Sequence, residues 1–245
     1  MTGIFVTGTD TGIGKTALSA LLLAELRRRN INAAPMKPVQ TGCVASGKWQ
    51  VASGGVPDLD YSLSMASMDV SKEQYANMSP CRFEPACSPH LAAEMVGTEI
   101  DIAEIVIAAR ALTSDYDFVI VEGAGGTLVP LNRRETMLDL MQALKFPVMI
   151  AARPGLGTIN HTLLTIRTLH SDGLDIAGVV FVASTDKESG LIEEDNANTI
   201  EQFGKVPLLG TIPYCAQLQN TSPDFSDLPI TVAAEIEKIV TQLGV

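Results

Sequence analysis

The chain has 245 residues, 46% of them hydrophobic, and a formal net charge of −11 at pH 7. An acidic protein repels nucleic acid and anionic membranes, so we expect neither as a partner. The longest apolar runs are too short to span a bilayer and the N-terminus carries no basic stretch or cleavage site, which predicts a cytoplasmic protein. The length fits a single α/β domain over residues 1–245.

Short apolar runs alternate with segments of helical length along the chain. Strands are predicted at 3–8, 31–38, 116–126, 146–152, 174–183 and 206–213, and the segment 16–29 has the period and basic end of a helix. This alternation predicts a mostly parallel central sheet with helices on both faces. Residues 41–57 are rich in glycine and serine, which predicts a mobile loop.

The cysteines favour free thiols in a reducing compartment. Cys43, Cys81, Cys87 and Cys215 show neither paired C-x-x-C spacing nor the density of a secreted scaffold. A metal site built from them is therefore not expected.

The segment FVTGTDTGIGKT, residues 5–16, is nearly a phosphate-binding loop. Threonine stands where the common pattern G-x-x-x-x-G-K-[S/T] has its first glycine. A preceding strand, Gly12 and Gly14 in the turn and a following helix nevertheless supply inward-pointing N–H groups. Lys15 is then expected to reach the terminal phosphates and the Thr16 hydroxyl to bind Mg²⁺. The fold is accordingly predicted to be P-loop NTPase-like.

A second cluster, MKPVQTG, follows the next predicted strand. Lys37 should project from the strand end into the same crevice as Lys15. A surface lysine is the alternative, but Pro38 and Gly42 favour a shaped turn. Two lysines at one phosphate favour transfer of the terminal phosphoryl group, because stabilising spread negative charge is most of that catalysis. Thr41 offers a hydroxyl in the same segment.

A third cluster, VEGAGG, spans residues 121–126. Glu122 ends a very apolar strand, where a carboxylate is costly unless it meets a cation such as Mg²⁺. Gly123 and Gly125 let the backbone come close to a ligand, although a glutamate that merely ends a strand is the alternative. Asp58 is interpreted as a helix N-cap, so capping alone is an equally good explanation of it.

The motifs GTDTGIGKT, KPVQTG and VEGAGG, in this order and spacing, resemble those of dethiobiotin synthetases, the ATP-dependent carboxylase-cyclases of biotin biosynthesis. The resemblance extends from the N-terminus to about Pro213. Members of that family share the T-G-T-D-T lead-in, which accounts for the threonine in the phosphate-binding loop.

The resemblance implies an ATP-dependent ligase that forms C–N bonds, with Mg²⁺ as metal ion. The other substrates implied are 7,8-diaminononanoate and CO₂ or bicarbonate. The 7-amino group captures CO₂ as a carbamate, whose oxygen attacks the γ-phosphorus of ATP. The 8-amino group then closes the ureido ring, leaving dethiobiotin, ADP and phosphate. No nucleophile from the protein is needed, so its task is to position groups and stabilise charge.

The resemblance also implies roles for individual residues. Catalytic roles fall to Thr11, Lys15 and Lys37. Mg²⁺ ligation falls to Thr16, Asp58 and Glu122, with Asp60 as an open alternative to Asp58. Nucleotide contacts fall to Gly12, Ile13, Gly14, Lys15, Thr16, Ala17, Asp58, Glu122, Gly123, Ala124, Gly125, Ser184, Pro213, Tyr214 and Cys215. Substrate contacts fall to Thr41, Gly157, Thr158 and Asn160, the last three at a helix start that a second subunit contributes, so a homodimer is implied.

Two positions depart from the pattern of the family. Ser184 stands where many members read the adenine edge with asparagine, so base selectivity is expected to be loose. An acidic residue that some members place further on would fall near Asn220, which leaves ribose contacts open. His90 and His161 are expected to be hydrogen-bonded structural histidines, because neither has another metal ligand at suitable spacing.

Two other protein classes share the loop architecture. A partitioning or membrane-switch ATPase would carry a second lysine at the position of Asp10, and the C-terminal segment lacks the basic face of a membrane anchor. A cobyrinate-type amidotransferase synthetase needs a further glutaminase domain, for which 245 residues leave no room. Both are disfavoured.

Overall fold

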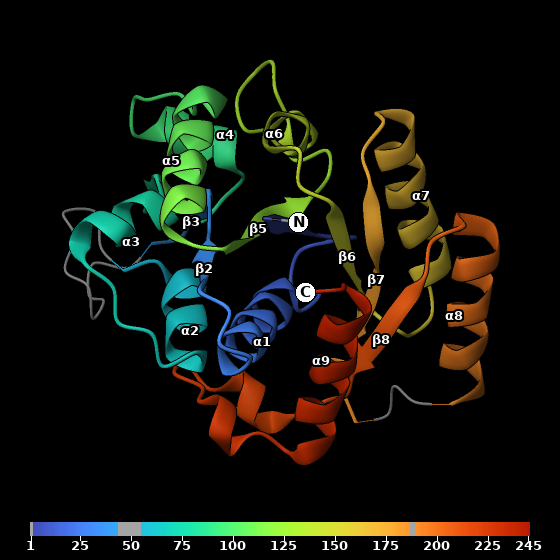
Figure 1. The fold of residues 1–245 in the computed structure, drawn as a ribbon. Helices are drawn as coiled ribbons and strands as arrows, with labels where there is room; N and C mark the ends of the chain where they lie inside the picture. The colour runs from blue at the N-terminus through green and yellow to red at the C-terminus, as the bar shows by residue number, and fades with distance from the viewer. Residues whose placement is uncertain (1, 44–54, 187–189) are drawn as a thin grey trace.

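A six-stranded parallel sheet forms the centre of the fold (Figure 1). The computed structural model describes residues 2–43, 55–186 and 190–245. The strand order is β2-β5-β1-β6-β7-β8, and each neighbouring pair is parallel. The strands are β1 (Gly3–Gly8), β2 (Ala33–Met36), β5 (Phe118–Gly126), β6 (Val148–Ala152), β7 (Ile176–Val182) and β8 (Leu208–Ile212). The predicted fold class and all six predicted strands are therefore confirmed.

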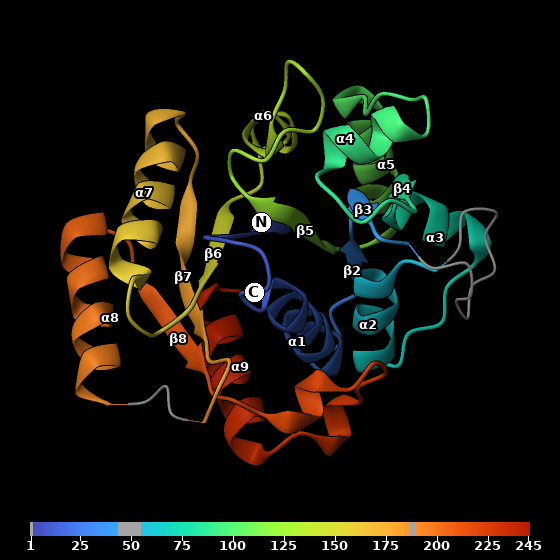
Figure 2. The same ribbon diagram turned by 180° about the vertical axis from the view of Figure 1, so that it is seen from behind.

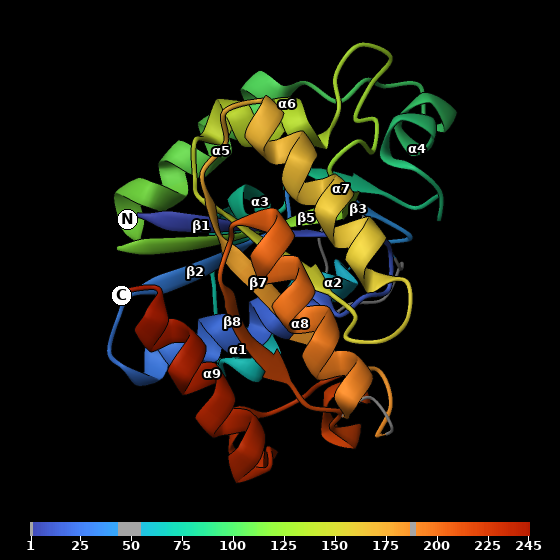
Figure 3. The same cartoon turned by 90° about the vertical axis from the view of Figure 1, so that its right-hand side faces the viewer.

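Helices cover both faces of the sheet, as the views from behind and from the side show (Figures 2 and 3). One face carries α1 (Lys15–Arg28) and α9 (Ile230–Gln242), and the other carries α5 (Ile102–Asp115), α6 (Met137–Leu144), α7 (Thr158–Ser171) and α8 (Leu191–Gly204). Successive strand residues point to opposite faces. Ile4 and Val6 of β1 accordingly belong to the core under α1, whereas Phe5 belongs to the other core.

A smaller unit stands at the β2 end of the sheet. It contains a two-stranded parallel sheet, β3 (Val39–Thr41) with β4 (Cys81–Phe83), and the helices α2 (Pro57–Met65), α3 (Lys72–Met78) and α4 (Pro89–Met95). Two short 3-10 helices, η1 (Ala216–Gln219) and η2 (Phe225–Asp227), precede α9. The loop predicted at 41–57 is wrong at its two ends, which belong to β3 and α2, and residues 44–54 lie outside the described residues.

Two expectations from composition can be compared with the fold. All four cysteines are free thiols, as predicted. Over the ranges that the structure describes, no helix combines the length and apolar character needed to cross a bilayer.

The different burial of two phenylalanines predicts different losses of stability when each is replaced by alanine. Phe181 of β7 is 1% exposed, whereas Phe203 of α8 is 69% exposed. Phe181→Ala leaves a cavity that close packing cannot fill, so we expect the free energy of unfolding to fall by about 3–5 kcal/mol. Phe203→Ala is the matched control and should change it by less than about 1 kcal/mol. Denaturant unfolding of both variants measures this, and equal losses would contradict the packing described.

Candidate active site

A cavity of about 1670 Å³ opens beyond the carboxyl ends of β1, β2, β5 and β7. Parallel sheets place ligands at this edge. Its wall includes these predicted site residues: Thr11, Gly12, Ile13, Gly14, Lys15, Thr16, Ala17, Lys37, Thr41, Asp58, Glu122, Ala124, Gly125, Ser184 and Cys215. The prediction that Lys37 and Lys15 face the same crevice is therefore confirmed, and Glu122 lines it as well.

The loop between β1 and α1 has the backbone of a phosphate cradle. Gly12 and Gly14 have φ angles of +69° and +93°, which favour glycine. A Cβ at Gly14 would also overlap the side chain of Val182 on β7. The helix begins at Lys15, and among the described residues no side chain caps its N-terminus. Its first N–H groups and the positive end of its dipole are thus available to an anion in the cavity.

Lys15 folds back over this loop. Its Nζ donates a 2.9 Å hydrogen bond to the carbonyl oxygen of Asp10, and its side chain is buried. Burial, together with the nearby charge of Lys37, lowers the pKa of Lys15 to about 8. A phosphate group would supply the negative charge that the protonated ammonium lacks here.

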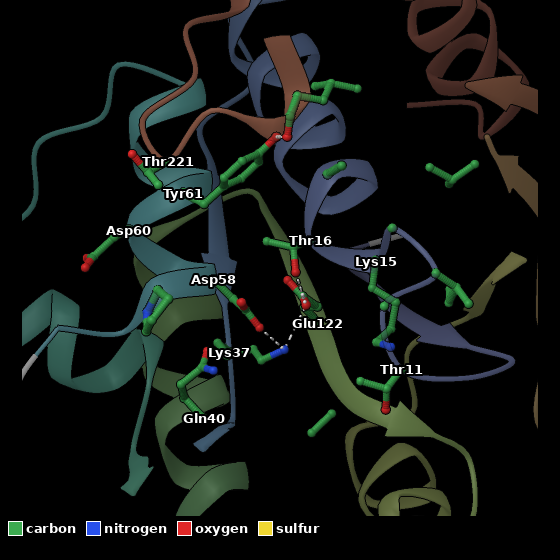
Figure 4. A pocket seen from close by; sticks show the side chains of 18 of the residues that line it. Thr11, Lys15, Thr16, Lys37, Gln40, Asp58, Asp60, Tyr61, Glu122 and Thr221 are labelled. Carbon is green, nitrogen blue, oxygen red and sulfur yellow. Dashed lines mark hydrogen bonds and ion pairs between the residues drawn. The ribbon is translucent and has the colours of Figure 1, made fainter. Parts of the chain in front are cut away.

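Lys37 lies between two carboxylates (Figure 4). Its Nζ is 2.7 Å from Oδ2 of Asp58 and 2.7 Å from Oε1 of Glu122. It also donates a 3.3 Å hydrogen bond to the carbonyl oxygen of Gly123. Burial works to lower the pKa of Lys37, but the two carboxylates outweigh it and raise that pKa. Lys37 is therefore a buried, charged ammonium group, and the surface-lysine alternative is wrong.

Glu122 carries the strongest indication of a cation site. Its Oε1 accepts hydrogen bonds from Lys37 and, at 2.8 Å, from the Thr16 hydroxyl, whereas its Oε2 is buried and has no hydrogen-bond partner among the described residues. Burial raises the pKa of Glu122, although Lys37 opposes this. A buried, unpaired carboxylate oxygen beside a threonine hydroxyl fits Mg²⁺, which uses one or two carboxylates plus substrate phosphates. Within the described ranges, no cluster of three or more His, Cys, Asp or Glu side chains could hold a metal by itself.

The structure distinguishes the two candidate acids of α2. Asp58 faces Lys37, whereas the side chain of Asp60 points away from it (Figure 4). The interpretation of Asp58 as an N-cap is wrong: the N-cap is Val56 and Pro57 is the first helical residue. Proline is favoured at that first position because it has no N–H to satisfy, so the helix begins before Asp58.

The far end of the cavity is built by β7 and the segment after β8. Ser184 and Cys215 line it, and so do Asn220 and Asp224, so an acidic residue does reach this wall. The Tyr61 hydroxyl of α2 donates a 2.8 Å hydrogen bond to the carbonyl oxygen of Leu218, which ties α2 to this segment.

Six predicted site residues do not line the cavity in the described part of the chain: Gly123, Gly157, Thr158, Asn160, Pro213 and Tyr214. Gly123 still contributes its carbonyl oxygen to Lys37. Gly157 has a φ of +92° and is the N-cap of α7, so the predicted helix start is confirmed. The expectation for the histidines is wrong for both: Nδ1 of His90 is buried without a partner among the described residues, and His161 is exposed.

Several cavity residues were not predicted from the sequence, among them Gln40, Arg153 and Tyr61. Gln40 is buried, and its Oε1 has no partner within the described ranges while its Nε2 donates to the Thr41 carbonyl oxygen. Arg153 is half-exposed, with Nη2 3.6 Å from Oδ2 of Asp10. Tyr61 follows Asp58 by three residues, a spacing that places both on one helix face and could have revealed it.

Comparison with known proteins identifies the family. A family model described as an AAA domain matches residues 2–222. The chain is 38% identical over 209 residues to the ATP-dependent dethiobiotin synthetase of Methanococcus vannielii, covering 85% of this chain and 92% of that protein. It is 41% identical over 225 residues to that of Anoxybacillus flavithermus, covering 90% and 95%. The chain belongs to the dethiobiotin synthetase family. A third relative, from Lysinibacillus sphaericus, is 36% identical over 241 residues, 98% of this chain and 97% of the relative.

Membership of the dethiobiotin synthetase family confirms the predicted family and enzyme class, an ATP-dependent ligase that forms C–N bonds. Solved structures show the fold alone. The cell division ATPase MinD of Pyrococcus furiosus has a TM-score of 0.63 at 15% identity, covering 100% of this chain and 99% of its own. MinD of Pyrococcus horikoshii complexed with Mg-ADP has a TM-score of 0.63 at 16% identity, covering 99% and 95%. These likenesses confirm the predicted P-loop NTPase-like fold.

The lowered pKa of Lys15 predicts a pH-dependent affinity for ADP. Bound phosphates favour the protonated ammonium, so above pH 8 binding must take up a proton. The affinity should be insensitive to this group below about pH 7 and should fall by up to about tenfold per unit as the pH rises beyond 8.

Calorimetry at pH 9 in two buffers of different ionisation enthalpy counts the protons exchanged. Net uptake is expected, since the ADP phosphates are already deprotonated at that pH. Net release, or no exchange, would contradict the environment described for Lys15.

Proposed function

We propose that this protein makes dethiobiotin from 7,8-diaminononanoate, CO₂ and ATP, with Mg²⁺ bound beside the phosphates. The observation that carries the proposal is the buried Lys37, 2.7 Å from both Asp58 and Glu122 at the mouth of a phosphate-binding loop. A simple nucleotide-binding module has no need of a second buried ammonium group there. Phosphoryl transfer needs one, because negative charge spreads over the transferring group.

The reaction proceeds in three steps. The 7-amino nitrogen attacks CO₂, forms an N–C bond and releases a proton, giving a carbamate. A carbamate oxygen attacks the γ-phosphorus as the bond to the β,γ-bridging oxygen breaks, which yields ADP and a carbamic-phosphoric anhydride. The 8-amino nitrogen then attacks the anhydride carbon, loses its proton and expels phosphate, closing the ureido ring. The protein forms no covalent bond in this sequence.

The phosphate-binding loop holds the nucleotide in this account. N–H groups of residues 12–17 bind the phosphates, Lys15 turns from the Asp10 carbonyl oxygen to the terminal phosphates, and Thr11 contacts the transferring group. Lys37 neutralises the carbamate and the γ-phosphoryl group, and Thr41 hydrogen-bonds the substrate. The protein thus promotes the reaction by positioning the reactants, without forming a bond to them.

Mg²⁺ would be held by Thr16, Asp58 and Glu122. The Thr16 hydroxyl is already 2.8 Å from Glu122, and Oε2 of that carboxylate, which has no partner among the described residues, is the buried acceptor that a cation would satisfy. When bound, the ion screens the charge of the phosphates during transfer. Asp58 is preferred to Asp60 because only Asp58 faces this group of side chains.

The remaining contacts belong to the nucleotide and to a second subunit. Residues 123–125, Ser184 and the segment 213–215 would contact the nucleotide, with loose base selectivity at Ser184. A homodimer would bring Gly157, Thr158 and Asn160 of one subunit to the substrate carboxylate in the other. This arrangement is supported by their place at the N-terminus of α7, outside their own cavity, and by Leu156, which is 98% exposed beside them. One domain over residues 1–245 and a cytoplasmic location remain predictions.

The proposal predicts that labelled bicarbonate enters an acid-stable product only when ATP and the diamine are both present. Incorporation should match phosphate release one to one, because each ring closure expels one phosphate. The matched control replaces 7,8-diaminononanoate with 8-aminononanoate, which cannot form the 7-carbamate. Phosphate release without incorporation would mean that another acceptor is served and would overturn the proposed function.

Lys37→Met should remove turnover and leave nucleotide binding largely intact. Loss of one preorganised charge at the transferring group lowers the turnover number by about 10²–10³-fold or more, whereas Gly12, Gly14 and Lys15 still bind the phosphates. Lys145→Met, at an exposed helix end, is the matched control. Single-turnover assays and calorimetry with ADP separate the two effects, and unchanged turnover would rule out the role given to Lys37.

A further inference from the structure

The helix that presents Asp58 has a weakly secured N-terminus. Its N-cap position is occupied by Val56, whose side chain cannot accept a hydrogen bond, and Pro57 follows at the first helical position. Asp58 comes one residue later and must hold its carboxylate toward Lys37 with 29% of the side chain exposed. A helix start without a cap frays readily, so some other group has to hold it in place.

Tyr75 of α3 supplies that group. Its side chain is fully buried, and its hydroxyl accepts a 2.9 Å hydrogen bond from the Val56 N–H. The same hydroxyl donates a 2.7 Å hydrogen bond to Oδ1 of Asp60. One oxygen atom thus contacts the residue at the start of the helix and a carboxylate in its first turn. Asp58 lies between these two contact points in the sequence.

Asp58 and Asp60, both on α2, are held toward different partners. Asp60 is directed toward α3 by Tyr75, whereas Asp58 is directed toward Lys37 at 2.7 Å. A tyrosine hydroxyl that both accepts and donates has its hydrogen-bonding capacity largely used, so its orientation is fixed. Buried hydrogen bonds of this kind fix the orientation of nearby ligand-binding side chains, and losing one costs free energy of folding.

We propose that Tyr75 is a positioning residue for the Mg²⁺-nucleotide site: it fixes the start of α2 so that Asp58 meets the cation, and it uses Asp60 as its anchor. The proposal rests on the proposed function only in that Mg²⁺ and a nucleotide bind in the cavity. It assigns Asp60 a role distinct from metal ligation.

Tyr75→Phe tests the proposal, with Tyr116→Phe as the matched control. Tyr116 is also buried and its hydroxyl accepts a 3.0 Å hydrogen bond from Gln74 of the same helix α3, but among the described residues this hydroxyl has no hydrogen bond to α2. Calorimetry gives the Kd for ADP in EDTA and in saturating Mg²⁺, and the ratio of the two measures how much the metal strengthens binding. The diamine is absent, so failure of the biosynthetic activity does not affect the result.

For Tyr75→Phe the metal-dependent strengthening should fall about tenfold, because groups that orient metal ligands are typically worth 10–100-fold in metal affinity. The Kd in EDTA should stay within about twofold of the original, since hydrogen bonds to phosphate from the loop are untouched. Tyr116→Phe should change neither value. An unchanged ratio in Tyr75→Phe, or an equal loss in EDTA, would overturn the proposal.

Asp60→Asn provides a second test that does not depend on the folding of Tyr75→Phe. The amide keeps an oxygen that accepts from the Tyr75 hydroxyl but loses the negative charge. The metal-dependent strengthening should therefore persist in Asp60→Asn and be lost in Asp58→Asn. A loss in Asp60→Asn as large as that in Asp58→Asn would make Asp60 a metal ligand and overturn the assignment.

Discussion

A buried ammonium group between two carboxylates is the interaction on which this active site depends. Lys37 comes from the end of β2, Glu122 from β5 and Asp58 from α2. Any one of these charges buried alone would be strongly unfavourable, and together they neutralise one another in part. The pairing also keeps the two carboxylates close together. In the function that we propose, a cation that replaced Lys37 between them would find its ligands already assembled, and Lys37 would be free to move toward the substrate.

Parallel strand topology brings these groups together from distant parts of the chain. Thr16 and Glu122 are 106 residues apart and Lys37 and Glu122 are 85 apart, yet each pair is hydrogen-bonded. Because β2, β5 and β1 are adjacent and parallel, their carboxyl ends meet at one edge. The fold shared with MinD proteins supplies this edge, whereas the chemistry depends on the particular residues placed on it.

The sequence was sufficient to predict the strands of the main sheet and the residues that lie next to the phosphate-binding loop. Strands such as β6 are buried along their whole length, and a continuous apolar run of this kind can be recognised in the sequence. Three-residue strands such as β3 and β4 have no periodic signal, so they were missed. The role of Tyr75 could not be predicted, because its partners Val56 and Asp60 are 19 and 15 residues away in the sequence and meet its hydroxyl only in the folded chain.

The most direct test of this account is a crystal structure of the protein with Mg²⁺ and a non-hydrolysable ATP analogue. We expect Mg²⁺ bound by Thr16, Asp58 and Glu122, with Nζ of Lys37 displaced from the carboxylates to the γ-phosphate. Lys37 remaining between Asp58 and Glu122, with the ion held elsewhere, would contradict the claim that one cation replaces the other.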